Sequence, residues 1–301
     1  MQIASLGECM IELSGSPLRK TYGGDTLNTA VYLARLLSGS THSVRYLTAV
    51  GEDSLSAELL QEWQAEHIVT DRIARLPGKM PGLYLVETDE HGERRFHYWR
   101  SDSAARHYFA SGIDFARLFD GLDAVYLSGI TLALFPTSER AHLIGALGAF
   151  KMDGGKVWFD NNFRPALWSA AAARDAYAQL YGIADIALLT EDDEAAVFGT
   201  ATADDMIARV LKAGGSEVII KRGSQPCIVA TSSGRGSVSA APVEKVVDTC
   251  AAGDSFAAAY LAARINGATL EQAAQNGHRL AGTVIQYPGA IMPSAAMPTQ
   301  N

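Results

Sequence analysis

The sequence predicts an α/β fold in which helices cover a mostly parallel β-sheet. Short apolar runs alternate with longer amphipathic segments along most of the 301 residues, and this is the pattern of repeated strand–helix units. One stretch, at about residues 81–100, breaks the alternation with two strand-like runs separated only by a turn. We therefore expect a single domain, 1–301, whose α/β body carries a small β-sheet.

The strands of the main sheet are expected where short runs are rich in aliphatic and aromatic residues, and the helices where apolar residues recur every three or four positions. The predicted strands are 2–7, 44–50, 124–128, 156–160, 185–189, 217–221 and 227–230. The predicted helices are 27–37, 54–66, 137–150, 170–181, 202–213, 252–266 and 270–285. Ligands of such folds bind beyond the carboxyl ends of the strands.

The small sheet is expected from the runs 81–88 and 94–100. They are joined by Asp89-Glu90-His91-Gly92-Glu93, which is typical of a hairpin turn. Both runs mix aromatic and polar residues, so neither face is expected to be fully buried. We interpret these runs as a β lid with a contribution from about residues 9–22. The alternative is a peripheral hairpin without a role.

Composition excludes several classes of protein. Hydrophobic residues make up 48% and charged residues 19% of the chain, as in ordinary globular enzymes. The net charge of −8 argues against nucleic-acid and anionic-membrane partners. Cys9, Cys227 and Cys250 lie far apart, which indicates neither a disulfide framework nor a zinc site. We see no secretion signal and no membrane-spanning run, so we expect a cytoplasmic protein.

The most informative motif is Asp248-Thr249-Cys250-Ala251-Ala252-Gly253-Asp254, which leads directly into an Ala-rich helical segment. Free backbone N–H groups and a partial positive charge allow a helix start to hold an anion. The small residues Ala251, Ala252 and Gly253 let a phosphate approach the backbone. Bound phosphate would repel Asp254 unless this carboxylate takes a proton. We therefore interpret Asp254 as the general base of a phosphoryl transfer; the alternative is a simple helix cap.

A second motif, Gly23-Gly24-Asp25-Thr26-Leu27-Asn28, places two glycines before a helix with short polar side chains in its first turn. Gly24, Asp25 and Asn28 are candidates to bind the hydroxyl groups of a sugar. The alternative is a plain turn with Asp25 or Thr26 as the helix cap.

Two arginines point to an acidic substrate. Arg100 ends the second lid run, and Arg164 follows a predicted strand within Asp160-Asn161-Asn162-Phe163-Arg164-Pro165. A guanidinium group suits bidentate recognition of a carboxylate, and a neutral sugar would not require two of them. The alternative for Arg100 is a solvated charge on an edge strand.

Together these motifs resemble the ribokinase-like (PfkB) carbohydrate kinases. The late D-T-x-A/G-A-G-D string and the early G-G-x-x-x-N string match the family's signatures. Pro81-Gly82-Leu83-Tyr84, Tyr98-Trp99-Arg100 and the string around Arg164 resemble its 2-dehydro-3-deoxygluconate kinase branch, and the resemblance covers about residues 2–297. It implies a three-layer sandwich with a β lid. It also implies ATP-dependent phosphorylation of the primary hydroxyl of 2-dehydro-3-deoxy-D-gluconate, in the catabolism of hexuronate-derived and pectin-derived sugar acids.

The resemblance also implies roles for matching residues. Asp254 would be the base, and Ala251, Ala252 and Gly253 would form the anion hole. The cofactors would be ATP, Mg²⁺ and a monovalent cation such as K⁺, with Glu194 bound to Mg²⁺ through water. The lids of related kinases pair between subunits, so we expect a homo-oligomer. The sugar acid would contact Gly24, Asp25, Asn28, Tyr84, Tyr98, Arg100 and Arg164, and ATP would contact Asn162, Lys221, Gly223, Ala251, Gly253 and Asn276.

Two positions depart from the family's usual pattern. Glu191 stands where Asn is usual in the metal-associated string that ends at Glu194. Ala251 replaces the commoner Gly, and we expect Ala251 to keep a negative φ angle. Two other functions remain open at this point: a kinase for a neutral ketose such as fructose or tagatose, and a catalytically silent sugar-acid sensor on the same fold.

Overall fold

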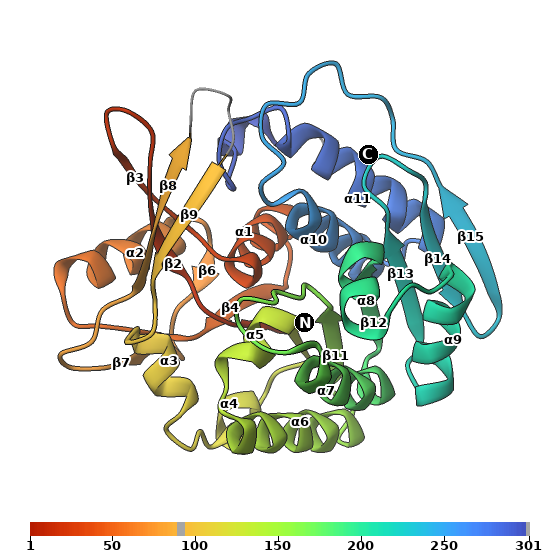
Figure 1. Ribbon diagram of the computed structural model, residues 1–301, viewed down its shortest axis with the longest axis horizontal. Helices are drawn as coiled ribbons and strands as arrows, with labels where there is room; N and C mark the ends of the chain where they lie inside the picture. Colours follow the sequence, from red (N-terminus) through yellow and green to blue (C-terminus); the bar gives the residue numbers. More distant parts are fainter. Residues whose placement is uncertain (89–93, 299–301) are drawn as a thin grey trace.

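The computed structural model describes residues 1–88 and 94–298 (Figure 1). In this part of the chain, the largest sheet has nine strands in the order β15-β14-β13-β12-β11-β10-β1-β4-β6. Neighbouring strands from β6 to β13 pair in parallel, and β14 and β15 add antiparallel pairs at one edge. The strands are β1 (Gln2–Leu6), β4 (Ser43–Leu47), β6 (Ile68–Val69), β10 (Ala124–Ser128), β11 (Lys156–Asp160), β12 (Ile186–Thr190), β13 (Glu217–Lys221), β14 (Cys227–Thr231) and β15 (Gly234–Val238).

Helices cover both faces of this sheet, because its strands are apolar on both sides. Ile3 of β1 belongs to one hydrophobic core and the next residue, Ala4, belongs to the other. The first core is closed by α1 (Asp25–Leu36), α2 (Ser54–Ala65), α10 (Ala252–Ile265) and α11 (Leu270–Val284). The second is closed by α3 (Ala104–Phe109), α4 (Phe115–Phe119), α5 (Gly129–Leu134), α6 (Thr137–Met152), α7 (Ala170–Ile183), α8 (Glu191–Phe198) and α9 (Ala203–Ala213).

A smaller sheet stands beside the body, at the left in Figure 1, with strand order β3-β2-β8-β9. Its strands are β2 (Met10–Ser14), β3 (Arg19–Gly23), β8 (Gly82–Thr88) and β9 (Arg94–Trp99). Met10, Tyr84 and Val86 form a small buried cluster of their own. Tyr98 and Trp99 keep 54% and 59% of their surface exposed. The small sheet therefore has little core of its own and presents aromatic side chains to its surroundings.

The predicted fold class, an α/β body with a mostly parallel sheet and a separate small sheet, is confirmed. Each predicted helix lies within two residues of its expected bounds. The predicted strand 44–50 is wrong in one respect, because the chain leaves the main sheet at Thr48. The backbone oxygen of Thr48 accepts a hydrogen bond from Ala74 N (3.0 Å), and β5 (Ala49–Val50) then pairs with β7 (Ala74–Arg75). The predicted hairpin turn 89–93 lies outside the described residues.

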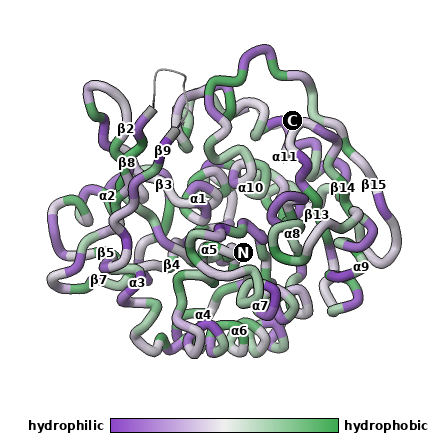
Figure 2. Tube along the Cα trace, in the orientation of Figure 1, coloured by the Kyte–Doolittle hydropathy of each residue, from purple (hydrophilic) through white to green (hydrophobic). Residues whose placement is uncertain are grey.

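Several elements were not predicted from the sequence pattern, among them α3, α4, α5, α8, β3 and β15. The edge strand β15 has the sequence Gly-Arg-Gly-Ser-Val, which contains no apolar run. Helix α8 opens with four consecutive acidic residues, and β3 is mostly polar and exposed. Figure 2 shows the hydrophobic segments concentrated in the strands and helices at the centre of the body. No helix in the described part of the chain is long and apolar enough to span a membrane.

Candidate active site

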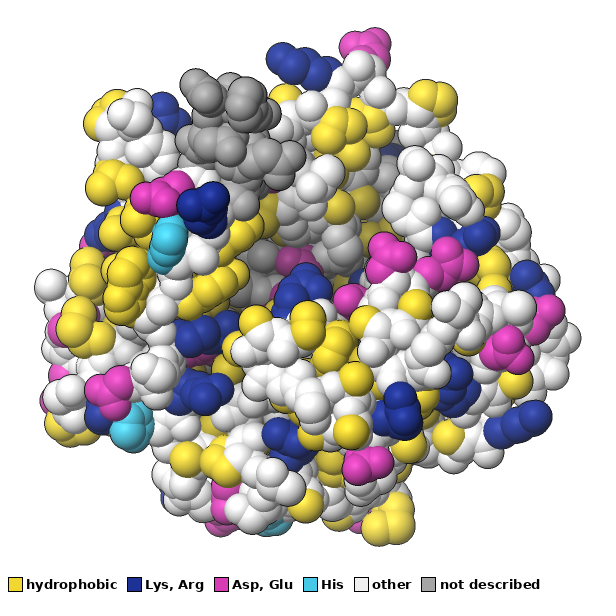
Figure 3. Space-filling model, in the orientation of Figure 1, with side chains coloured by type: hydrophobic (Ala, Val, Ile, Leu, Met, Phe, Trp, Pro, Cys, Tyr) yellow, Lys and Arg dark blue, Asp and Glu magenta, His cyan; other side chains and the backbone are white. Residues whose placement is uncertain are grey.

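Most of the predicted site residues gather where the body faces the small sheet. Figure 3 shows a hollow there, in which acidic and basic side chains meet hydrophobic ones. Asp160 ends β11 and Lys221 ends β13, so both follow the carboxyl ends of nearby parallel strands. The first turns of α1 and α10 contribute Asp25 and Asp254. This is the edge of the sheet where ligands of parallel α/β folds bind.

Asp254 is the third residue of α10 and is not its cap. The N-cap is Ala251, and no side chain caps the helix start. Instead, Asn28 Nδ2 of α1 donates a hydrogen bond to Asp254 Oδ2 (2.8 Å). Thr29 Oγ1, also from α1, donates to the backbone oxygen of Asp254 (3.3 Å). The carboxylate is therefore held by a neighbouring helix and lies in front of its own helix start.

The surroundings of Asp254 favour its protonated form. Protein atoms displace water from the carboxylate, and this desolvation raises its pKa to about 7. The negative charges of Asp25 and Asp160 act in the same direction, whereas the Asn28 hydrogen bond and the Lys221 charge oppose them. A carboxylate whose pKa lies near neutral pH is suited to accept a proton from a hydroxyl group.

The backbone of the anion-hole loop corrects one expectation. Ala251 has φ 59° and ψ 14°, which is the left-handed region, so the expected negative φ is wrong. The loop turns tightly here: Cys250 N donates to Asp248 Oδ1 (2.9 Å) and Ser255 N to Ala251 O (2.9 Å). This turn requires the conformation that Gly adopts freely, and an L-residue with a Cβ pays about 1–2 kcal/mol for it.

Lys221 lies beside the helix start. A Cβ placed on Gly253 would be 3.5 Å from Lys221 Nζ, so the ammonium group borders the small residues of the loop. Lys221 Nζ also donates to Asp160 Oδ2 (2.6 Å), and both side chains are largely buried. Gly223, two residues further on, has φ +59°. A cation and a helix start therefore face the same space, as anion binding requires.

The start of α1 forms the opposite side of the site. Gly24 is its N-cap, so neither Asp25 nor Thr26 caps the helix. Asn162, predicted to contact the nucleotide, donates from Nδ2 to Asp25 Oδ2 (2.7 Å) and so lies with the predicted sugar ligands. Burial raises the pKa of Asp25, and hydrogen bonds from Ser128 and Asn162 oppose this shift.

Asn28 carries the clearest sign of a missing partner. Its Nδ2 donates to Asp254, but its Oδ1 is buried and has no hydrogen-bond partner among the described residues. A buried acceptor without a partner costs about 1–3 kcal/mol. A donor brought by a ligand, such as a sugar hydroxyl next to Asp254, would satisfy it.

The aromatic residues of the small sheet extend from this side of the site. Tyr84 and Tyr98 are paired across β8 and β9, with ring centroids 5.8 Å apart. A Cβ on Gly23 would lie 2.9 Å from Tyr84 Oη, so the glycine allows the tyrosine to approach the chain just before α1. Tyr84 Oη also donates to Glu12 Oε2 of β2. Tyr98 has no such anchor in the described contacts and stays half-exposed.

Both candidate arginines have acidic partners. Arg100 donates from Nε (2.8 Å) and from Nη2 to Glu8 Oε2, and the Glu8 side chain is fully buried. Arg164 is 53% exposed, and its Nη1 lies 3.6 Å from Asp193 Oδ1. Desolvation raises the pKa of Asp193, and the Arg164 charge opposes that shift. Arg100 is thus largely buried, whereas Arg164 is half-exposed and is held by its contact with Asp193 and by a hydrogen bond from Nη1 to the backbone oxygen of Phe163 (2.9 Å).

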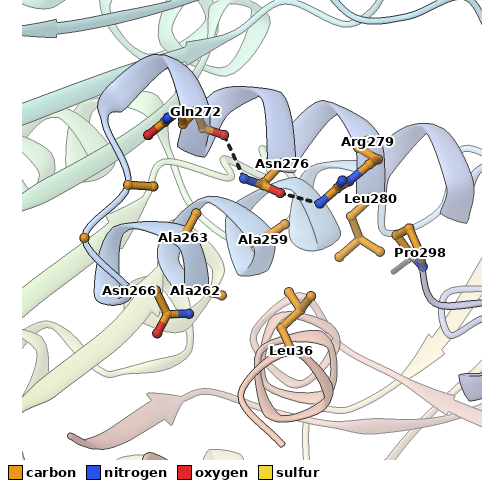
Figure 4. A pocket seen from close by; sticks show the side chains of 12 residues that line it. Leu36, Ala259, Ala262, Ala263, Asn266, Gln272, Asn276, Arg279, Leu280 and Pro298 are labelled. Atoms are coloured by element: carbon orange, nitrogen blue, oxygen red, sulfur yellow. Dashed lines mark hydrogen bonds between the residues drawn. The ribbon is translucent and has the colours of Figure 1, made fainter. Parts of the chain in front are cut away.

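Two predicted residues lie apart from this group. Asn276 lines a groove of about 370 Å³ between α1, α10 and α11, where it bonds to Gln272 O and Arg279 (Figure 4). Glu194 is fully buried, and it accepts hydrogen bonds from Tyr181 on one oxygen and Arg209 on the other. Among the described residues, no group of three or more His, Cys, Asp or Glu side chains is arranged to hold a metal ion.

Sequence reasoning assigned no role to four acidic residues at this site: Glu8, Glu12, Asp160 and Asp193. Asp160 stands inside a quoted motif and Glu8 directly follows the predicted strand 2–7, so the available signal was a carboxylate next to a strand end. Glu12 and Asp193 have no local signal, because their partners are distant in sequence. Glu191, which replaces the usual Asn, pairs with Arg222 Nε at 2.8 Å.

Comparison with known proteins agrees with this geometry. The profile described as "pfkB family carbohydrate kinase" matches residues 2–297. A 2-dehydro-3-deoxygluconokinase of Dickeya dadantii is 48% identical over 98% of both chains, and one of Escherichia coli K12 is 46% identical over 99% of both.

Solved structures show the same fold. A 2-dehydro-3-deoxygluconokinase of Thermotoga maritima aligns with a TM-score of 0.83 at 22% identity, over 97% of this chain and 94% of its own. A fructokinase of Xylella fastidiosa with bound ATP also gives a TM-score of 0.83, at 21% identity over 99% and 95% of the two chains. The three-layer architecture with its small sheet is therefore ribokinase-like, and the chain belongs to the pfkB family of carbohydrate kinases.

Proposed function

We propose that this protein is a 2-dehydro-3-deoxygluconokinase, which transfers the γ-phosphoryl group of ATP to the 6-hydroxyl of 2-dehydro-3-deoxy-D-gluconate. The names of relatives at 43–48% identity over nearly the whole chain support the substrate. The observation that carries the chemistry is the pair formed by Asp254 and Asn28 in front of the α10 start.

In this proposal Asp254 accepts the proton of the 6-hydroxyl while the oxygen attacks the γ-phosphorus. The bond between that phosphorus and the bridging oxygen breaks, and ADP leaves with the electron pair. Asn28 orients Asp254 through Nδ2, and its buried Oδ1 accepts a hydrogen bond from the sugar. A positioned base of this kind typically contributes about 10²–10⁴-fold.

The loop from Ala251 to Gly253 would stabilise the charge of the transferred group. Its backbone N–H groups and the helix start supply partial positive charge, and Lys221 supplies a full one. These donors are held by the fold before the reaction begins, so they need no reorganisation in the transition state. Gly223, Asn162 and Asn276 remain proposed nucleotide contacts.

ATP would bring Mg²⁺, which is usually held by one or two carboxylates together with substrate phosphates. The residues present fit this requirement, because Asp160 and Asp193 supply two carboxylates. Both lie near Lys221: Asp160 is paired with it, and its charge lowers the pKa of Asp193. The metal would neutralise phosphate charge. Glu194 has both oxygens engaged in the interior, so any contact with the metal would pass through water. A K⁺ requirement and a cytoplasmic location remain predictions from the sequence.

The sugar acid would lie between α1 and the small sheet. Gly24, Asp25 and Asn28 would bind its hydroxyl end, and Tyr84 and Tyr98 would cover it. Arg100 and Arg164 would face its carboxylate and keto group, which leaves the 6-hydroxyl near Asp254. The small sheet acts as a lid in this proposal.

A neutral ketose kinase is the second candidate, and one observation favours it: both arginines already have carboxylate partners. A fructokinase of Klebsiella pneumoniae is 28% identical over 85% of this chain. The higher identity of the sugar-acid kinases, and the exposure of Arg164, favour the first candidate.

We also propose a homo-oligomer. Leu18, Met80 and Trp99, in and next to the small sheet, are each at least half exposed. Large apolar side chains gathered in this way are typical of a protein contact. Light scattering decides this: a monomer mass in the working concentration range would contradict the proposal.

The decisive assay is ADP release with ATP and Mg²⁺, run in parallel with 2-dehydro-3-deoxygluconate, fructose, ribose and gluconate. We expect turnover with the keto-deoxy acid alone. Turnover with fructose would support the ketose kinase, and turnover with either neutral sugar, fructose or ribose, would contradict the recognition of a carboxylate. No ADP release with any of the four compounds would contradict both kinase proposals and favour the catalytically silent sensor.

A further inference from the structure

Glu8 lies where the chain first leaves the body for the small sheet, between β1 and β2. Arg100 lies where the chain finally returns, directly after β9. The two are joined by the Arg100 Nε and Nη2 bonds to Glu8 Oε2, and Ser103 Oγ donates to Glu8 Oε1. Along the described residues, the chain passes between the body and the small sheet four times, and we call these points crossings. One fully buried carboxylate thus connects the first and the last crossing.

The other two crossings pack against the same residue. A Cβ on Gly24, just after β3, would lie 2.4 Å from the backbone oxygen of Glu8. A Cβ on Gly82, at the start of β8, would lie 3.2 Å from Glu8 Oε1 and 3.2 Å from Arg100 Cβ. All four strands of the small sheet therefore meet the body around Glu8, with no room for another side chain there.

This packing decides what Arg100 can offer to a ligand. An arginine side chain has many rotamers, and this freedom is lost when the guanidinium group is held in one orientation. Glu8 holds it before any substrate arrives, and it also balances the positive charge. Because Glu8 balances its charge, Arg100 offers a ligand mainly oriented N–H donors. The half-exposed Arg164 would supply most of the positive charge that a carboxylate attracts.

We propose that Glu8 is a positioning residue: it orients Arg100 toward the carboxylate of the acceptor sugar and anchors the small sheet to the body. The first half of this inference rests on the proposed function. The second half, the anchoring, does not depend on the identity of the substrate.

The kinetic test is Glu8→Gln, which keeps the size of the side chain and removes its charge. We expect KM for the sugar acid to rise about 10-fold or more, with kcat and KM for ATP within about 2-fold. Glu66→Gln is the matched control, because Glu66 forms the same kind of pair with Arg35 inside the body (2.6 and 2.7 Å). This control should leave KM for the sugar acid unchanged.

A double-mutant cycle separates positioning from a general loss of structure. In an Arg100→Ala background, Glu8→Gln should add no further rise in KM, because it would act through Arg100. Effects that simply add, or an equal rise in KM for both substrates, would overturn the positioning role. If Glu8→Gln does not fold, Glu8→Asp is the alternative. It keeps the negative charge but moves it away from Arg100 by one methylene group, and the same rise in KM for the sugar acid is expected.

Hydrogen exchange of the unliganded protein tests the anchoring without any assay of activity. In Glu8→Gln, the amides of β8 and β9 should exchange faster, while those of α10 and α11 keep the wild-type rate. Unchanged exchange in β8 and β9 would overturn the anchoring. If the wild type does not phosphorylate the sugar acid but exchange still rises in these strands, the substrate proposal fails and the anchoring stands.

Discussion

The two ends of the site are built differently. At the proposed phosphate end, a helix start, strand ends and the buried pair of Lys221 and Asp160 belong to the body. At the proposed sugar-acid end, Arg100 and Arg164 come from the edge of the small sheet and from a loop, and each contacts an acidic partner. The first end is made by backbone and local sequence, and the second by pairs of side chains distant in sequence. We therefore expect the reaction to depend on the first and the choice of substrate on the second.

The largest effect is expected at the phosphate end. Asp254→Asn removes the base but keeps the size of the side chain, so kcat should fall by at least about 10²–10⁴-fold. Binding of the sugar and of ATP, measured by calorimetry, should persist. Near-normal turnover in this variant would contradict the role of Asp254.

The same variant should be more stable than the wild type at high pH. The pKa of Asp254 is raised from 3.8 to about 7 in the folded protein, so the folded state binds this proton more tightly. The contribution of protonated Asp254 to the free energy of unfolding is therefore lost as pH rises from about 4 to about 7. Asp254→Asn has no titrating group at this position and does not lose this contribution. Above pH 7 we expect the variant to gain at least about 1 kcal/mol in urea unfolding. If the stability difference between the variant and the wild type were the same at pH 5 and pH 8, the pKa of Asp254 would not be raised.

The next effect is expected at the sugar-acid end. Arg164→Ala should raise KM for the sugar acid about 10-fold, because a charge-assisted hydrogen bond is lost at a half-exposed position. KM for ATP should change little. Arg235→Ala is the control, since Arg235 forms an exposed pair with Asp204 on the far edge of the sheet. A rise confined to KM for ATP would contradict this role and would indicate that Arg164 contacts the nucleotide instead.

The pH profile provides a third test, of intermediate size. Since Asp254 must be ionised to accept a proton, kcat/KM should rise with pH and level off above about 7. The hydrogen bond from Asn28 lowers the pKa of Asp254, so Asn28→Ala should move the midpoint to higher pH. A midpoint near pH 4 in the wild type would exclude Asp254 as the titrating group.

The smallest expected effect is at Ala251. Ala251→Gly relieves the left-handed strain at φ 59°, although Gly also gains freedom in the unfolded chain. We expect a net stabilisation of about 0.5–1 kcal/mol in thermal unfolding, with kcat unchanged. Ala252→Gly is the control, because Ala252 begins the helix without a positive φ, so Gly relieves no strain there and should not stabilise the protein.

Local sequence was sufficient to predict the strands, the helices and the loop at the phosphate end. The small residues before Asp254 and the strand end at Lys221 lie together because the fold class itself places them at one edge. The partners of Arg100, Arg164 and Tyr84 could not be predicted in this way. Glu8 and Arg100 are 92 positions apart, and only the crossings of the small sheet bring them together. The φ of Ala251 was also missed, because backbone hydrogen bonds overrode the preference of a single residue.

The exposed face of β9 has a practical consequence. The sequence contains four tryptophans, and three of them, Trp63, Trp158 and Trp168, are buried in the body. Trp99 alone is largely exposed, and it is adjacent to Arg100. Its fluorescence should therefore respond to whatever covers the small sheet, whether a ligand or a second subunit, against a nearly constant background. Trp99 thus offers an intrinsic fluorescent reporter next to Arg100, a proposed substrate contact, and on the surface proposed for subunit contact.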